Sequence, residues 1–318
     1  MIRRFVRLLL FLFILAVGLL VYTFIPWNLT VDPAAGSGIG RNRRPLADLP
    51  DDVSLAIVRA GKMPARQLFS YRGGSLTGPY ENGMIAVLVR HGEDLIALDT
   101  GFGSKVDEHW KTIPALMRSL SSFEKERPLK EQLAATEISP DSLKRIFITH
   151  SHWDHISGLE DFPFVETWMP EDELAFIKSG AYPGLADQII DRLHVRTFSF
   201  KDAPYENFPS SYDLYSDGSV VFVPLPGHTP GSTGMFVNFK SGKRFLFIGD
   251  LTWAREGIDL PAERPWLARK LVDMDEARVR EMIQKVHALK AADASLVVVP
   301  AHDRRVHEEL PSFPQFVN

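Results

Sequence analysis

The chain of 318 residues contains no cysteine. This absence excludes disulfide bonds, a thiolate nucleophile and the cysteine-ligated zinc of zinc fingers. A strong charge of either sign is also missing, because 36 lysine and arginine residues against 40 aspartate and glutamate residues leave a formal net charge of −4. The balance gives no indication of the basic face that nucleic-acid processing requires, so we expect no nucleic-acid partner.

Histidine and aspartate are concentrated instead in one short run, where residues 149–155 read THSHWDH. A lone histidine after a strand is usually an ordinary polar residue, but three histidines and an aspartate within six residues indicate a metal site. Imidazole and carboxylate are the ligands that borderline divalent metals prefer. With three residues further along the chain, the candidate ligands are His150, His152, Asp154, His155, His228, Asp250 and His302.

Each group of candidate ligands follows a short apolar run that is typical of a buried strand. These runs are residues 146–149, 220–223, 245–248 and 296–299. Because functional side chains gather in the loops at strand ends, we expect four strand ends to deliver all seven ligands to one place.

The motifs around these ligands resemble those of the metallo-β-lactamase superfamily. Its HxHxDH signature is present as HSHWDH at 150–155, and the matching landmarks follow in order as PGHTPGS at 226–232, FIGD at 247–250 and PAHD at 300–303. Upstream, LIALDTG at 95–101 matches a further turn of the superfamily. The resemblance covers roughly residues 54–303.

The resemblance implies two ligand triads that share one bridge: His150, His152 and His228 for the first ion, Asp154, His155 and His302 for the second, and Asp250 between them. Two divalent cations would then hold a bridging hydroxide that attacks a substrate carbonyl. Zinc is the default from the ligand types, although iron, manganese or cobalt would also be accepted.

Three further roles follow from the same resemblance. Asp99 is expected beneath the metal loop, where it would orient a ligand. Asp154 and Asp250 are the expected catalytic carboxylates, with Asp154 a candidate proton carrier between the attacking water and the leaving group. Trp153 and Trp253 lie beside ligands in the sequence and are expected to line the substrate pocket.

The fold implied by the resemblance is a four-layer αββα sandwich with the metals at one edge between the sheets. Periodicity alone predicts only a mixed α/β protein with two sheets. Besides the strands before the ligands, we predict strands at 54–59, 67–71, 84–89 and 95–98, and helices near 105–120, 170–178, 185–192 and 275–291.

The amino terminus carries a separate signal. Arg3, Arg4 and Arg7 precede eighteen uncharged residues, 8–25, which as a helix would be about 27 Å long and just span a bilayer. We expect residues 1–26 to be an uncleaved membrane anchor rather than a removed signal peptide. Residues 27–52 are expected to form a linker, and residues 53–318 the hydrolase domain. The arginines favour an extracytoplasmic domain, periplasmic in a bacterium.

The expected activity is metal-dependent hydrolysis of a small-molecule substrate, most plausibly a lactone or an ester. Quorum-quenching lactonases share all seven ligands and end soon after the last histidine, whereas true metallo-β-lactamases generally replace the residue at Asp250. Many lactonases have a tyrosine where this chain has Trp253, a mismatch that weighs against the lactonase assignment. A glyoxalase II-like thioesterase, a phosphodiesterase or nuclease, and a non-catalytic anchored binding protein are the alternatives. The sequence does not specify an oligomeric state.

Overall fold

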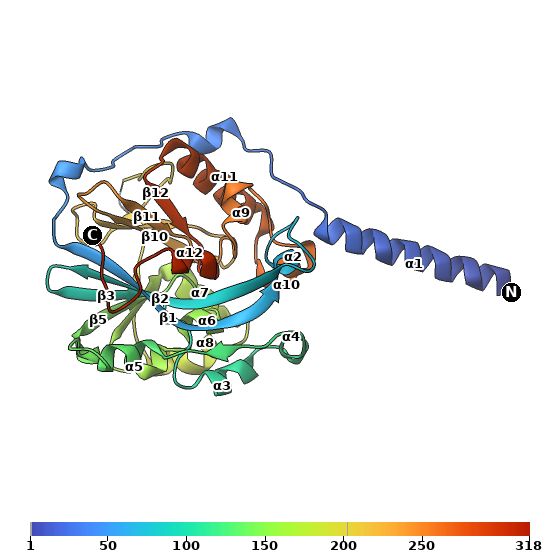
Figure 1. Ribbon diagram of the computed structural model, residues 1–318, viewed down its shortest axis with the longest axis horizontal. Coiled ribbons are helices and arrows are strands. Elements are labelled where there is room, and N and C mark those ends of the chain that lie inside the picture. The colour runs from blue at the N-terminus through green and yellow to red at the C-terminus, as the bar shows by residue number, and fades with distance from the viewer. Residues whose placement is uncertain (1, 202) are drawn as a thin grey trace.

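Two mixed β-sheets form the centre of the molecule (Figure 1). The computed structural model describes residues 2–201 and 203–318. The first sheet has the order β4-β1-β2-β3-β5-β6-β7 and contains β1 (Val53–Arg66), β2 (Pro79–His91), β3 (Asp94–Leu98), β4 (Glu124–Lys125), β5 (Leu143–Phe147), β6 (Glu166–Pro170) and β7 (His194–Phe198). The second has the order β12-β11-β10-β9-β8 and contains β8 (Tyr212–Asp213), β9 (Val220–Pro224), β10 (Thr233–Asn238), β11 (Arg244–Phe247) and β12 (Leu296–Val299).

The alternation of side chains along the strands builds the core between the two sheets. Alternate residues of a strand point to the same face, so Leu55 and Ile57 of β1 pack toward Phe222 of β9 and Met235 of β10, and all four are fully buried. The intervening residue Ala56 faces the opposite way, into a second buried cluster under the helices.

Helices other than α1 cover the outer faces of both sheets, which gives the four layers that the resemblance predicted. The helices are α1 (Ile2–Phe24), α2 (Gln67–Ser70), α3 (Val106–His109), α4 (Ala115–Leu120), α5 (Leu129–Ala134), α6 (Trp153–Ile156), α7 (Glu171–Ser179), α8 (Leu185–Ile189), α9 (Glu256–Asp259), α10 (Trp266–Val272), α11 (Glu276–Ala292) and α12 (Arg304–Glu308). Residues of α5, α7 and α8 pack against the first sheet, whereas Val279, Ile283 and Val286 of α11 pack against the second.

Two predicted elements are wrong. Residues 67–71 form α2 rather than a strand, because β1 extends to Arg66 and the chain must then turn back toward β2. A Cβ atom at Gly74 would lie 2.3 Å from the Gln67 carbonyl, so the turn closes tightly on this helix. The single helix predicted near 105–120 is divided into α3, a 3-10 turn and α4, since Pro114 cannot continue a helix started before it.

Helix α1 projects away from the body (Figure 1). Within the described part of the chain it is the one helix long and apolar enough to cross a membrane, with a mean hydropathy of 2.6 over Arg3–Phe24, a property that signal sequences share. The segment after it runs along the body: Leu29 N donates to Pro261 O at 2.9 Å, and Gly40 N donates to Glu206 Oε2 at 2.6 Å.

One of the five histidines outside the ligand motifs, His307 of α12, is fully buried. Its Nε2 lies 2.9 Å from Pro300 O. Burial lowers the pKa of His307 from 6.5 to about 4. The unfolded chain therefore takes up a proton below pH 6.5 that the folded chain refuses until about pH 4.

We therefore expect His307 to contribute acid sensitivity. The unfolding free energy should be unaffected by this group above pH 6.5 and should fall by about 3 kcal/mol as the pH drops toward 4. His307→Asn should flatten that part of the curve, measured by denaturant unfolding of the metal-free chain. His194→Asn is the control, because His194 is exposed and its replacement should leave the dependence of unfolding free energy on pH unchanged. If His307→Asn lost stability between pH 6.5 and 4 as steeply as the unaltered chain, His307 would not be the source of the acid sensitivity.

Candidate metal centre

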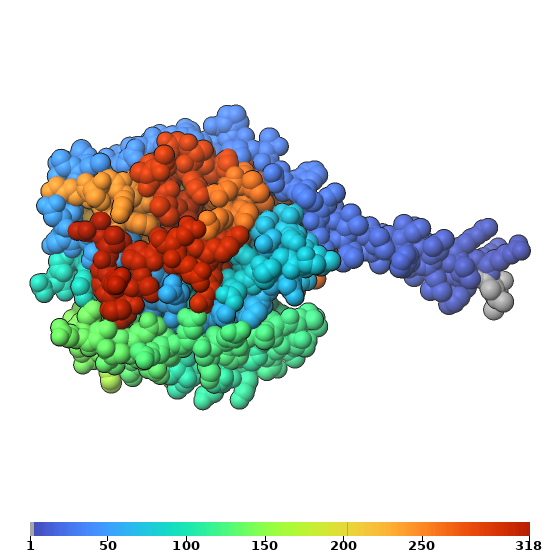
Figure 2. All heavy atoms as spheres, in the orientation of Figure 1, coloured from blue at the N-terminus to red at the C-terminus, as the bar shows by residue number. Residues whose placement is uncertain are grey.

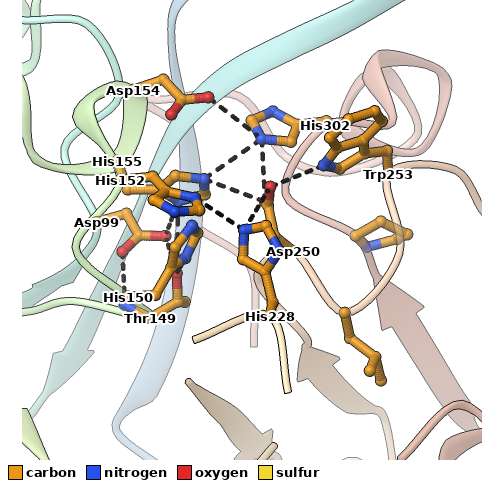
Figure 3. Close-up of polar contacts among 12 residues, drawn as sticks. Asp99, Thr149, His150, His152, Asp154, His155, His228, Asp250, Trp253 and His302 are labelled. Atoms are coloured by element: carbon orange, nitrogen blue, oxygen red, sulfur yellow. Dashed lines mark hydrogen bonds and ion pairs between the residues drawn. The ribbon is translucent and has the colours of Figure 1, made fainter. Parts of the chain in front are cut away.

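All seven candidate ligands meet at one edge of the two sheets (Figure 3). The loop after β5 and the short helix α6 carry four of them, and the chain beyond β9, β11 and β12 supplies His228, Asp250 and His302. The strands end side by side in the two sheets, which is why residues up to 152 positions apart in the sequence converge here.

The first triad consists of His150, His152 and His228, all buried. Nε2 of His228 lies 2.8 Å from Nδ1 of His152, and Nε2 of His150 is buried without a hydrogen-bond partner. Burial, reinforced by the neighbouring imidazoles, lowers the pKa of His150 and of His152 well below the ordinary value. Unprotonated rings with nitrogen atoms directed at a common point are what a metal ion requires.

The second triad consists of Asp154, His155 and His302. Nε2 of His302 lies 3.3 Å from Nε2 of His155 and 3.4 Å from Asp154 Oδ2. Burial lowers the pKa of His155, but Asp99 and Asp250 outweigh it and hold that pKa well above the ordinary value. Asp99 and Asp250 thus stabilise positive charge at this triad, which either bound protons or a metal cation could supply.

Asp250 lies between the two triads. Its Oδ1 is 3.1 Å from His155 Nε2 and 3.0 Å from His302 Nε2, and its Oδ2 is 3.5 Å from His228 Nε2. Burial raises the pKa of Asp250, but the imidazoles of His302 and His155 outweigh it and hold that pKa well below the ordinary value. A deprotonated carboxylate in contact with both triads has the position and charge of a bridging ligand.

Asp99 and a backbone carbonyl bind the Nδ1 atoms of two candidate ligands, His155 and His302. His155 Nδ1 donates to Asp99 Oδ2 at 2.8 Å, and Asp99 also accepts from Thr149 N at 2.7 Å and Thr149 Oγ1 at 2.8 Å. Asp99 thus lies beneath the loop that carries His150, His152, Asp154 and His155. On the opposite side, His302 Nδ1 donates to Gly83 O at 2.9 Å. These contacts leave Nε2 of both histidines free to face the centre.

Asp273 and Arg264 complete the support of the first triad, and sequence reasoning missed both. His228 Nδ1 lies 3.0 Å from Asp273 Oδ1, and the Arg264 guanidinium binds the same oxygen. Burial raises the pKa of Asp273, but Arg264 and His228 outweigh it and lower that pKa. Arg264 Nη1 also donates to Asp250 O at 2.8 Å, so one arginine links two of the ligand loops.

Glu173 is a third residue that the motifs did not indicate. This fully buried carboxylate of α7 accepts from Ser151 N at 2.7 Å and Ser151 Oγ at 2.5 Å, and from Thr229 Oγ1 at 2.6 Å and Gly231 N at 3.2 Å. Ser151 lies between His150 and His152, and Thr229 follows His228. Glu173 therefore fastens together the two loops that carry the first triad.

Asp273→Asn tests the support of the first triad. The change should lower the metal affinity of that triad by about tenfold to a hundredfold, because an amide orients His228 less firmly than a carboxylate. Competition with a chromogenic chelator measures the affinity. Asp99→Asn is the matched variant for the second triad. If neither variant altered binding, these aspartates would have no part in holding ligands.

A cavity of about 200 Å³, partly open to solvent, adjoins the centre. Trp153 and Trp253 both line it. The Trp253 indole donates through Nε1 to Asp250 Oδ2 at 2.8 Å, so its one N–H is taken by the carboxylate that lies between the two triads (Figure 3). Besides the candidate ligands, Asn82 and Ser121, the rest of the lining comes from Met63, Met84, Ile113, Met117, Tyr182 and Val272.

The chain belongs to the metallo-β-lactamase superfamily, whose sequence profile matches residues 86–302. It is similar to a probable metallo-hydrolase of Mycobacterium tuberculosis, with 26% identity over 240 residues that cover 70% of this chain and 75% of the relative. It is also similar to the N-acyl homoserine lactonase AttM of Rhizobium radiobacter, with 24% identity over 197 residues, 61% of this chain and 71% of the relative.

Solved structures agree on the fold. An N-acyl homoserine lactone hydrolase with N-hexanoyl-L-homoserine bound at its catalytic metal centre superposes with a TM-score of 0.67 at 15% identity, covering 84% of this chain and all of that chain. The dizinc quorum-quenching lactonase AidC superposes with a TM-score of 0.53 at 20% identity. The match covers 84% of this chain and 90% of that chain. The chain is therefore a metallo-hydrolase of this superfamily, close to its lactonases, and its histidine and aspartate cluster fits a metal site.

Proposed function

We propose that the chain holds two divalent cations, zinc by default, and hydrolyses a lactone or an ester. The position of Asp250 carries the proposal, because its two carboxylate oxygens face different triads. When bound, such cations lower the pKa of water and polarise a carbonyl. The proposed ligands are His150, His152 and His228 on one side and Asp154, His155 and His302 on the other.

The protein groups around the centre have defined tasks in this proposal. Trp253 keeps Asp250 oriented through its indole N–H, so that the carboxylate stays between the triads. Asp154, the most exposed of the ligands, faces the cavity and is placed to carry a proton from the attacking water to the leaving oxygen. Trp153 and the apolar lining exclude water from the substrate.

The substrate class rests on relatives and on the cavity. The lactonase relatives support a lactone, and the apolar walls suit an acyl chain. Against this stands Trp253, whose N–H is taken by Asp250 and is not available to a substrate carbonyl. We therefore propose carboxylic ester bonds in general, with lactones as one group among them.

We further propose that residues 1–26 anchor the chain in a membrane, that 27–52 connect the anchor to the hydrolase domain at 53–318, and that this domain lies on the extracytoplasmic side. The supporting features are the apolar α1 and the three arginines before its apolar core. Flotation of the full chain with vesicles tests the anchor, and protease protection of the domain tests its side.

A substrate panel tests the activity. The full chain, metal-loaded and in mild detergent, should hydrolyse lactones and nitrophenyl esters much faster than a nitrophenyl phosphodiester, a glutathione thioester or a β-lactam. Preferential cleavage of the phosphodiester or the thioester would replace the proposal with one of those activities. Absence of turnover on every substrate, with metal bound, would favour a binding protein.

A further inference from the structure

Exposed apolar side chains lie on α2, α4 and α10 and in the loops that follow α2 and α10. Helix α4 exposes Leu116 and Leu120 by 68% and 79%, and α10 exposes Leu267 by 55%. We call the whole group the apolar rim: Phe69, Leu76, Leu116, Leu120, Leu267, Leu271 and Met274. Single exposed apolar residues are ordinary, but a group of them on adjoining elements indicates a surface that something covers.

The same helices line the cavity and form the rim. Met117 of α4 and Val272 of α10 line the cavity, while their neighbours Leu116 and Leu271 are exposed. The rim residues of α4 and α10 therefore lie next to residues that line the cavity.

Helix α1 ends against the rim. The rings of Phe24 and Phe69 meet edge to face with centroids 5.8 Å apart. Arg72 is almost fully buried, and its guanidinium donates to Tyr22 O at 2.8 Å and to Ile25 O at 3.1 Å. The backbone N–H of Arg72 donates to Glu263 O at 3.0 Å. No free linker separates α1 from the body at this point. In Figure 1, α1 leaves from the side on which α2, α4 and α10 lie, and Figure 2 shows it projecting from that side of the packed surface.

The charge of the rim suits an anionic surface. Residues 110–123 carry Lys111 and Arg118 and no acidic residue. On α10 the exposed Lys270 lies between Leu267 and Leu271 and forms an ion pair with Glu276 at 2.5 Å, so Lys111 and Arg118 carry the unbalanced positive charge of the rim. Apolar side chains with interspersed basic ones are the pattern of helices that lie in the interface of a bilayer.

We infer that the apolar rim rests in the interface of the membrane that α1 crosses, and that the cavity takes its substrate directly from that bilayer. The substrate class is then an ester or lactone with a long acyl chain that partitions into lipid. This inference rests on the proposed function, both for the ester chemistry and for the anchor. A second copy of the chain is the competing occupant of the rim.

Contact with lipid is measured without reference to activity. Because the chain has no cysteine, Leu120→Cys offers a single site for an environment-sensitive fluorophore. Phe164→Cys is the control, since Phe164 is 86% exposed and precedes β6, at the end of the strands opposite the metal loop. In vesicles that hold the full chain, the label at 120 should shift to the blue and be quenched by lipid-borne quenchers, whereas the label at 164 should not.

Substrate delivery is measured with two esters. In vesicles, the double variant Leu116→Ser, Leu120→Ser should hydrolyse a long-chain ester about tenfold more slowly than the unaltered chain, because weakened contact with the bilayer slows transfer of the substrate. The same variant should hydrolyse a short, water-soluble ester at the unaltered rate. Phe164→Ser should leave both rates unchanged.

The outcomes separate the two proposals. If the short ester is cleaved but the label at 120 reports water, the inference is wrong and the hydrolase proposal survives. If the label is shifted but lipid-borne quenchers do not reach it, another protein surface covers the rim and the inference is again wrong. If the label is quenched but no ester is cleaved, the hydrolase proposal fails, and substrate delivery fails with it.

Discussion

Replacing Asp250 with asparagine should slow hydrolysis by on the order of a thousandfold or more, because the proposed pair of cations would lose the anionic ligand that they share. The carboxylate contacts His155 and His302 through one oxygen and faces His228 with the other. An amide keeps the size of the side chain but supplies one oxygen and no charge. The loss should therefore appear in kcat at saturating metal, without unfolding of the chain.

The measurement is steady-state turnover together with metal content by elemental analysis. Asp273→Asn serves as the comparison, since it removes a charge from the same region without touching a shared ligand, and its turnover should recover when metal is added in excess. Activity of Asp250→Asn within tenfold of the unaltered chain would mean that Asp250 does not bridge.

Replacing Glu173 with alanine should lower the unfolding free energy of the metal-free chain by on the order of 3 kcal/mol or more, because the donors from Ser151, Thr229 and Gly231 are left buried without acceptors. The same change removes the side chain that joins the loop of His150 to the loop of His228. Affinity for the first cation should fall as well, although Glu173 contacts none of the ligand side chains directly.

Denaturant unfolding measures the first effect, and metal titration measures the second. Glu173→Gln provides a graded variant, since the amide oxygen still accepts from one loop while the amide nitrogen faces donors of the other. Its unfolding free energy should lie between those of the alanine variant and the unaltered chain. Equal stability of the alanine variant would show that water or nearby groups satisfy the donors.

The convergence of the candidate ligands was predictable because each one is local in sequence to the strand that positions it. His150 follows β5 by three residues, and Asp250 follows β11 by three, so an apolar run with a polar turn was enough to identify them. The likeness to a known superfamily then supplied the layers and the pairing of the triads. The fold and the convergence of the seven side chains were thus available from the sequence.

The residues behind the ligands could not be found in this way. Glu173, Arg264 and Asp273 reach the centre only because α7 and the segment around α10 pack against it, and no spacing rule relates them to the histidines. Their burial was also unexpected, since acidic and basic residues are rarely buried without partners. The wrong strand at 67–71 has a similar origin, because tertiary contact at Gly74 rather than local pattern shaped that turn.

The paired cations are tested most directly by the number of metal ions bound per chain. The full chain, stripped with a chelator, reloaded with zinc and freed of excess, should contain two ions by elemental analysis. The variants His228→Ala and His302→Ala, each missing a ligand of one triad, should contain one. A value of one or none in the unaltered chain after metal is supplied would contradict a two-metal centre.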